Sequence, residues 1–135
     1  MSELNNLIDT AKGKGSFQTL LKAAEILGLL DKYRNEGPYT VFAPVESAFD
    51  PIPDDVIDES FEDNEYLLGI INYHIAKGKY TTEDLKNMNS LETVSGNSLK
   101  ITANGGIKVD TARIIEADIE CTNGIIHAID EILVP

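Results

Sequence analysis

Four side chains in this sequence belong to types that carry metal or nucleophilic chemistry. His74, His127 and Cys121 offer two imidazoles and a thiol, and Asp130 adds a carboxylate close to His127. Zinc binds such groups, but zinc-site sequences show paired short ligand spacings, and none occurs here. A cysteine nucleophile needs a base and an orienting group, and the residues after Cys121 match no hydrolase signature. The sequence therefore predicts no catalytic residue, no metal site and no cofactor.

Two other segments resemble ligand-binding motifs only superficially. Gly13-Lys14-Gly15-Ser16 lacks the glycine spacing and the preceding strand of a phosphate-binding loop, so nucleotide binding is rejected. The acidic segment 54–65 does not have the ligand spacing of an EF-hand. We expect that segment to form a solvated acidic surface.

Composition and charge exclude several classes of partner. The chain has 135 residues, the usual size of one domain, and we expect residues 1–135 to form a single domain. Asp and Glu number 23 against 11 Lys and Arg, and the formal charge of −12 repels phosphate backbones and anionic lipid. No stretch approaches transmembrane length, and the first residues show no signal-peptide pattern. Nucleic acid and direct membrane insertion are therefore not expected.

Hydrophobic spacing in the N-terminal half predicts helices. Apolar residues recur at helical intervals in the segments 4–11, 17–27 and 64–74. Thr81, followed three residues later by Asp84, resembles a capping box that begins a further short helix. These segments place most of the helical content before residue 90.

Caps and chain breakers give the expected boundaries of these helices. Ser16 and Asn64 are expected N-caps, and Gly78 suits the end of the helix that Asn64 begins. The polar run 31–37 is expected to be a loop.

The C-terminal half changes to an alternating pattern that predicts strands. From Ser90 onward apolar residues recur with a period near two, and the glycine-containing segments 95–97 and 104–106 predict tight hairpin turns. An earlier strand is expected at 40–43, where β-formers precede a proline. Helices early and strands late favour an α+β fold. The remaining strands are expected at 107–109, 114–120 and 125–134.

Three segments, in order, resemble the signatures of the fasciclin family. Residues 40–49 are similar to its first signature segment, in which a TVFAP-type strand precedes a small helix. Tyr73-His74 is similar to its central pair, and residues 123–135 to its second signature, an NGxxHxID-type strand. Three ordered motifs are much more specific than one. The resemblance covers about residues 16–135. The residues that carry it are Thr40, Phe42, Pro44, Tyr73, His74, Asn123, Gly124, His127 and Asp130.

The resemblance implies a fold and a class of function. The fold would be α+β, with helices of the N-terminal half packed against a β-sandwich or wedge-shaped sheet. The function would be non-catalytic adhesion or recognition outside cells or on their surface, with a surface or matrix protein or a glycan as partner. The alternative is a carrier of a small apolar ligand, and an enzyme is the third hypothesis. A large apolar pocket would favour the carrier.

The segment before the second signature suggests a partner-binding site. Asp118, Ile119 and Glu120 are the candidate residues, because this segment resembles an Asp-Ile-containing motif implicated in integrin contact in animal members of the family. In the alternative interpretation, Asp118 is a turn or edge residue and Ile119 belongs to the core. His127 and His74 lie on apolar faces, where buried structural histidines with satisfied hydrogen bonds are expected.

Overall fold

The computed structural model describes residues 6–15, 17–53, 55–56, 59, 62–103, 106–110 and 112–133. Within this part of the chain, helices dominate the first half and strands the second, as the sequence predicts. The helices are α1 (Leu7–Lys14), α2 (Gln18–Ile26), α3 (Leu30–Asn35), the 3-10 helix η1 (Glu46–Phe49), α5 (Asn64–Tyr73) and α6 (Thr82–Leu85). The strands are β1 (Tyr39–Pro44), β2 (Ile75–Lys77), β3 (Ser90–Glu92), β4 (Ser98–Thr102), β5 (Lys108–Val109), β6 (Ala112–Cys121) and β7 (Gly124–Ile129).

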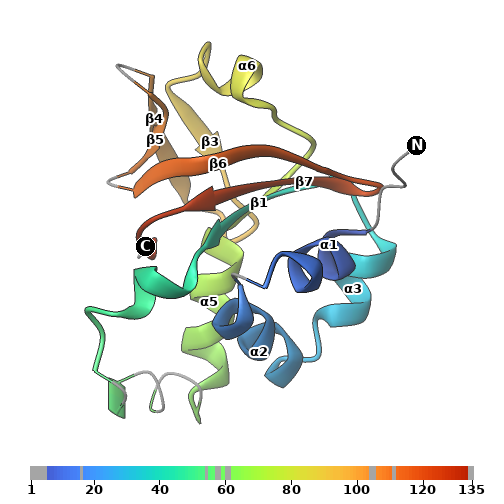
Figure 1. Cartoon of the computed structure of the whole chain (residues 1–135), viewed down its shortest axis with the longest axis vertical. Helices are drawn as coiled ribbons and strands as arrows, with labels where there is room; N and C mark the ends of the chain where they lie inside the picture. Colours follow the sequence, from blue (N-terminus) through green and yellow to red (C-terminus); the bar gives the residue numbers. More distant parts are fainter. Residues whose placement is uncertain are drawn as a thin grey trace.

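The strands form one mixed sheet with the two signature strands at its centre. The strand order is β2-β1-β7-β6-β5-β4-β3, and β1 pairs in parallel with β7 while every other neighbouring pair is antiparallel. Helices α1, α2, α3 and α5 lie on one side of β1 and β7, and α6 lies on the other side (Figure 1). This arrangement confirms the predicted α+β fold class.

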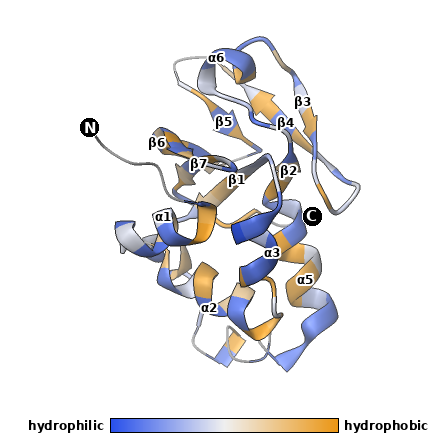
Figure 2. Ribbon diagram, turned by 90° about the vertical axis from the view of Figure 1, so that its right-hand side faces the viewer, coloured by the Kyte–Doolittle hydropathy of each residue, from blue (hydrophilic) through white to orange (hydrophobic). Residues whose placement is uncertain are grey.

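The sheet bends, so that its two edges approach each other. Strands β3, β4 and β5 lie away from the helical layer (Figure 2). The backbone N–H of Val94, after β3, donates to the carbonyl oxygen of Ile75 in β2 at 2.8 Å, although β2 and β3 are the opposite edges of the sheet. The bend encloses a wedge of core between the two halves of the sheet.

Both faces of the central strands are buried. One apolar cluster lies between the helices and the sheet and includes Ala43 and Ile126, and a second fills the bend of the sheet and includes Phe42 and Ile129. Adjacent residues on a strand point to opposite faces, so strands covered on both faces read as continuous apolar runs. Of the predicted strands 40–43 and 125–134, the parts that form β1 and β7 pair with each other in the interior of the sheet.

Several predicted boundaries are wrong. The polar run 31–37 is not a loop, because most of it forms α3, which buries Tyr33 while its charged side chains face outward. Asp63 rather than Asn64 caps α5, since the Asp63 carboxylate accepts a hydrogen bond from the backbone N–H of Tyr66. Gly78 does not end that helix, because β2 comes between them.

Other predicted boundaries agree with the structure or fall outside its described part. The capping box of Thr81 and Asp84 is present at the start of α6, and the 95–97 turn joins β3 to β4. Strand β7 ends at Ile129, before the predicted end at residue 134. The predicted N-cap Ser16 and residues 104 and 105 of the second predicted turn lie outside the described residues. No helix in the described part is long and apolar enough to cross a membrane.

Candidate functional site

Strand β6 carries the predicted partner-binding residues on an irregular ladder. Glu116 pairs with Ala128 and Ile119 with Ile126, so β6 has one more residue than β7 between these pairs. This β-bulge contains Asp118, whose φ of 57° lies in the left-handed region that non-glycine residues rarely adopt. The bulge therefore interrupts the strand at the predicted site.

The side chain and backbone of Asp118 both hold the bulge in place. The carboxylate accepts hydrogen bonds from the backbone N–H of Thr82 at 2.9 Å and from its hydroxyl at 2.7 Å. Desolvation alone would raise the pKa of Asp118, but these two hydrogen bonds and the nearby Lys86 ammonium outweigh it and lower the pKa. Asp118 is thus a surface residue that fastens β6 to the start of α6.

Ile119 and Glu120 are placed differently from Asp118. Ile119 is partly buried and packs against the cluster under the helices. The Glu120 carboxylate is exposed and lies 3.3 Å from the Lys79 ammonium. The structure therefore brings the three predicted residues to one strand, with only Asp118 and Glu120 on the open surface.

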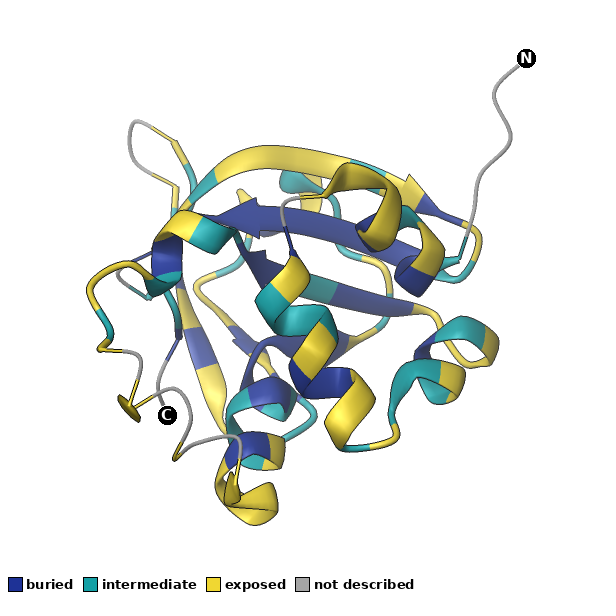
Figure 3. Ribbon diagram, turned by 60° about the horizontal axis from the view of Figure 1, so that its bottom comes forward, coloured by how far each residue is buried: buried dark blue, intermediate teal, exposed yellow. Residues whose placement is uncertain are grey.

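The exposed part of β6 includes a large apolar side chain that the sequence analysis did not single out. Ile115 is 56% exposed, and Glu116 beside it forms a 2.7 Å ion pair with Lys14 of α1. Figure 3 shows β6 as an exposed band over the buried strand β7. The alternation of apolar and polar residues along β6 does not indicate that Ile115 is exposed, because the bulges shift the pairing register of this strand.

His127 joins the bulge to the loop before α6. Its Nδ1 accepts the backbone N–H of Asp118 at 3.1 Å, and its Nε2 lies 2.7 Å from the carbonyl oxygen of Tyr80, to which it must donate. The ring stacks on Phe42 with centroids 5.7 Å apart. Burial lowers the pKa of His127, which keeps the ring neutral.

His74 also uses both ring nitrogens, but as the opposite tautomer. Its Nδ1 donates to the carbonyl oxygen of Ile70 at 2.7 Å, and its Nε2 accepts the backbone N–H of Leu133 at 2.9 Å. Burial lowers its pKa to about 4. Each histidine is therefore a neutral ring with both nitrogens engaged, as expected for structural histidines.

The four side chains that could bind a metal or react do not lie together at one site. They are those of His74, His127, Cys121 and Asp130. Cys121 lies in the cluster under the helices and His127 stacks in the bend of the sheet, on the opposite face. Burial raises the pKa of the Cys121 thiol, which disfavours the reactive thiolate. Asp130 binds the backbone N–H of Arg113 at 2.9 Å. Among the described residues, no three His, Cys, Asp or Glu side chains are grouped to hold a metal ion.

The signature residues Asn123 and Gly124 fasten three elements together. The Asn123 amide donates to the carbonyl oxygens of Tyr33 and Glu36, at 2.7 and 2.6 Å, and its Oδ1 accepts the backbone N–H of Leu7 at 2.9 Å. A side chain on Gly124 would collide with the carbonyl oxygen of Tyr39. The Asn-Gly pair therefore joins α1, the end of α3 and the start of β1.

The remaining signature residues also have structural contacts. The Thr40 hydroxyl donates to the carbonyl oxygen of Gly78 at 2.8 Å and accepts the backbone N–H of Tyr80 at 2.9 Å. The Tyr73 hydroxyl donates to Asp110 at 2.6 Å. Phe42 and Pro44 of β1 are buried.

Glu46 is a structural residue that the sequence analysis missed. The Glu46 carboxylate accepts two hydrogen bonds from Thr19, one from the backbone N–H at 2.6 Å and one from the hydroxyl at 2.9 Å. It therefore satisfies one of the backbone N–H groups that lack a partner within the helix at the start of α2. Phe17, at the N-cap position, makes no side-chain cap bond. The two partners are 27 residues apart, and no local pattern links them.

Comparisons with known proteins agree with the signatures. The family model of the Fasciclin domain matches residues 15–135. "Uncharacterized protein sll1735" of Synechocystis is 35% identical over 95% of this chain and 96% of its own length. "Transforming growth factor-beta-induced protein ig-h3" of Sus scrofa is 33% identical over 97% of this chain, which spans 20% of that protein.

A solved structure supports the fold. The FAS1 domain pair of the insect cell adhesion molecule Fasciclin I matches 97% of this chain and 51% of that chain, with a TM-score of 0.78. At 20% sequence identity, this similarity shows the fold alone.

Proposed function

Because the chain belongs to the fasciclin domain family, we propose that it is a non-catalytic recognition module that binds a protein or glycan partner outside the cell or on its surface. The exposed, bulged surface of β6 carries this proposal. Exposed residues on a rigid scaffold are a common location of recognition sites. Insect Fasciclin I, which has the same fold, is a cell adhesion molecule, and we extend that role to this chain as part of the proposal.

The proposed contact surface combines one apolar side chain with carboxylates. Ile115 is 56% exposed, and the charged residues Arg113, Glu116 and Glu120 are also exposed on the same strand. An apolar centre within a polar rim is typical of protein contact surfaces. The ion pairs of Glu116 with Lys14 and of Glu120 with Lys79 are exposed, so a partner's cations can compete for these carboxylates at little cost.

The three predicted site residues have different roles in this proposal. Asp118 shapes the bulge through Thr82, and Glu120 presents charge to the partner. Ile119 anchors the segment on the core. This assignment extends the contact surface to Ile115 and Glu116.

The net charge favours a partner that is not itself strongly anionic. The chain carries a formal charge of −12, which disfavours nucleic acid and anionic membrane surfaces as partners. A surface or matrix protein, or a glycan, meets this condition. One domain with a small contact surface would bind weakly, and many copies on one surface would give useful adhesion.

We assign no catalytic activity to this chain because the side chains that could act as a base or a nucleophile are buried or already hydrogen-bonded. His74 and His127 use both ring nitrogens in structural hydrogen bonds, and Cys121 is a buried thiol with a raised pKa. Neither histidine can act as a base without losing a buried contact. These observations favour recognition over catalysis.

The test compares the binding of three surface variants. Beads coated with the domain are assayed on arrays of extracellular proteins and glycans, with Ile115→Ser as the test and Ile26→Ser as the matched control. Ile26 lies on α2 and is 44% exposed. We expect Ile115→Ser, and separately Glu116→Gln with Glu120→Gln, to reduce attachment while Ile26→Ser retains it. Equal attachment by all three folded variants would remove β6 as the site, and a turnover activity lost in His127→Ala would overturn the non-enzymatic assignment.

A further inference from the structure

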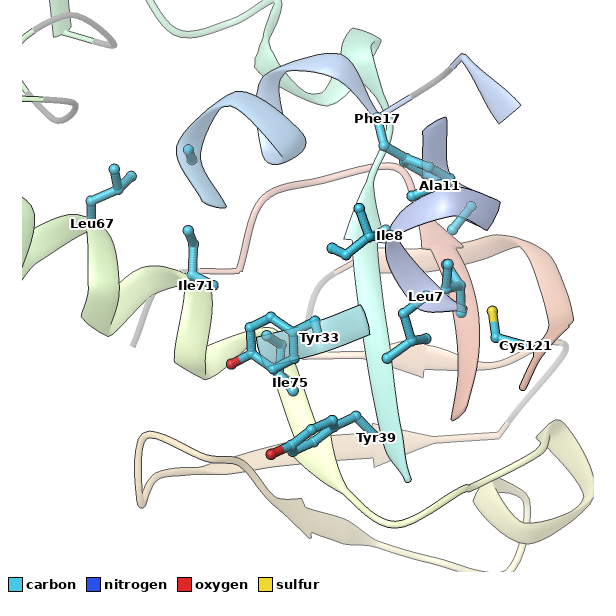
Figure 4. Packing of buried hydrophobic residues seen from close by; sticks show 14 residues of the cluster. Leu7, Ile8, Ala11, Phe17, Tyr33, Tyr39, Leu67, Ile71, Ile75 and Cys121 are labelled. Atoms are coloured by element: carbon cyan, nitrogen blue, oxygen red, sulfur yellow. The ribbon is translucent and has the colours of Figure 1, made fainter. Parts of the chain in front are cut away.

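A cleft lies between the two edges of the bent sheet. The edges are joined where the backbone N–H of Val94, after β3, donates to the carbonyl oxygen of Ile75 in β2. Both side chains belong to the apolar cluster under the helices, and Figure 4 shows Ile75 in this cluster. Beside this fixed junction, the cleft has Lys77 on one wall and Glu92 on the other, and its volume is about 430 Å³.

The wall formed by β3 presents unused backbone groups to the cleft. Asn89 and Thr93 are hydrogen-bonded to the neighbouring chain of β4, each at 2.9 Å. Hydrogen-bonded and non-bonded pairs alternate in an antiparallel ladder, so the N–H and C=O groups of Ser90 and Glu92 point away from β4. Within the described part of the chain, these groups make no hydrogen bond across the cleft.

The facing wall, formed by β2, has the same property. His74 and Gly78 flank β2 and are hydrogen-bonded to β1 and to Pro38 before it, at 2.8 Å each. The same alternation turns the N–H and C=O groups of Lys77 away from β1 and toward the cleft. The cleft therefore lies between two strand edges with unused donors and acceptors, and such an edge is a template for an added strand.

The side chains of the cleft form an apolar floor and a charged rim. Leu91 is buried in the bend of the sheet, and Tyr80 and Met88 pack against the same cluster. Lys77 and Glu92 are exposed on opposite walls, and neither forms an ion pair with another described residue. Successive side chains of a strand point to opposite faces. An added strand would therefore place an apolar residue on the floor and charged residues of both signs at the rim.

We propose that this cleft binds a short extended peptide segment of a partner protein, which pairs with the backbone of Ser90 and Glu92 as an added strand. The volume of about 430 Å³ is in the usual range of ligand sites, about 300–1,000 Å³. A second copy of this chain fits less well, because both edges are short and carry charged side chains, which oppose pairing between two folded sheets. The site shares no residue with the proposed recognition surface on β6.

The test uses a peptide with blocked ends. The probe is acetyl-Thr-Lys-Val-Glu-Thr-amide, whose valine points to one face while its lysine and glutamate point to the other. Binding is followed by NMR shifts of the backbone amides of Lys77, Ser90 and Glu92, with Ala24 of α2 as the distant reference. We expect saturable shifts in the cleft alone. N-methylation of the probe at valine and glutamate removes N–H groups that face both edges and should weaken binding about tenfold.

Protein variants separate backbone pairing from charge. Glu92→Pro removes the outward N–H but no hydrogen bond to β4, and it should abolish binding, since proline is tolerated on edge strands. Glu92→Gln keeps the N–H and should weaken binding about threefold through the lost charge pair. Glu25→Gln, an exposed change on α2, is the matched control and should bind as the wild type does. Circular dichroism checks that each variant is folded.

Two results would overturn the proposal. The first is the absence of saturable shifts in the cleft with the parent peptide, and such shifts from cellotriose instead would identify a glycan site. The second is an equal affinity for the parent and N-methylated peptides, which would show that the backbone of the bound segment does not pair with the strand edges.

Discussion

The backbone N–H of Asp118 donates to Nδ1 of His127 across the β6–β7 ladder, at 3.1 Å. The same ring donates from Nε2 to the backbone carbonyl oxygen of Tyr80. Two residues further along the chain, the backbone N–H and hydroxyl of Thr82 donate to the Asp118 carboxylate. These contacts form a closed ring of hydrogen bonds around the bulge. The buried His127 therefore stabilises the bulge of β6 on which the proposed recognition surface lies.

Loss of the His127 ring should destabilise the fold. His127→Ala removes two buried hydrogen bonds and the stacking on Phe42, so we expect a loss of about 1–3 kcal/mol in the free energy of unfolding. Urea denaturation measures this loss. Arg113→Ala, an exposed change on β6, is the control and should have little effect. An unchanged denaturation midpoint in His127→Ala would contradict the structural role.

Acidification should destabilise the protein through its buried histidines. Burial lowers the pKa of His74 from 6.5 to about 4 and also lowers that of His127. The unfolded chain takes up a proton below about pH 6.5, whereas folded His74 does so only near pH 4, so the free energy of unfolding falls as the pH decreases through this window. The expected slope from His74 is about 1.4 kcal/mol per pH unit.

Urea denaturation across this pH window measures that slope. His74→Gln, which cannot take up the proton, should show a shallower dependence of stability on pH. All other ionisable groups are common to both proteins, so the difference between the two curves isolates the contribution of His74. Parallel curves for the wild type and the folded variant would show that His74 does not contribute.

The two glycine changes Gly124→Ala and Gly69→Ala should have opposite effects. A Cβ on Gly124 collides with the Tyr39 carbonyl oxygen where β1 and β7 begin, so we expect a loss of about 1–3 kcal/mol. Gly69 lies inside α5 with no atom within 4 Å of the position of its Cβ, so alanine there should stabilise by up to about 1 kcal/mol. Thermal unfolding of both variants provides the measurement. A Gly124→Ala protein as stable as Gly69→Ala would contradict the close approach of the two strands.

Two tyrosine changes should separate an unpaired hydroxyl from a paired one. Tyr33→Phe removes a buried hydroxyl that has no hydrogen-bond partner among the described residues, so stability should stay equal or rise by about 1 kcal/mol. Tyr73→Phe removes the 2.6 Å hydrogen bond to Asp110 and should cost about 1–2 kcal/mol. Denaturation of the two variants in parallel gives the comparison. A loss for Tyr33→Phe as large as that for Tyr73→Phe would show that the Tyr33 hydroxyl has a partner in solution.

The sequence by itself determined the family, the fold class and the two central strands. Strands β1 and β7 are buried on both faces, so they appear as continuous apolar runs that can be recognised locally. The capping box of Thr81 and Asp84 was equally readable, because all its partners lie within one helical turn. The buried positions of His74 and His127 followed from the apolar faces on which they lie.

Only the tertiary structure decided the contacts between distant segments. Helix α3 has a polar sequence, and the burial of Tyr33 under the other elements makes it part of the core. Glu46 and Thr19, like Asn123 and Leu7, meet only because the chain closes long loops around the sheet. The exposure of Ile115 depends on the bulges of β6. The burial of the Tyr33 hydroxyl depends on the packing of several helices and strands around it. Local spacing carries no information on such contacts, since their energies arise from residues far apart in the sequence.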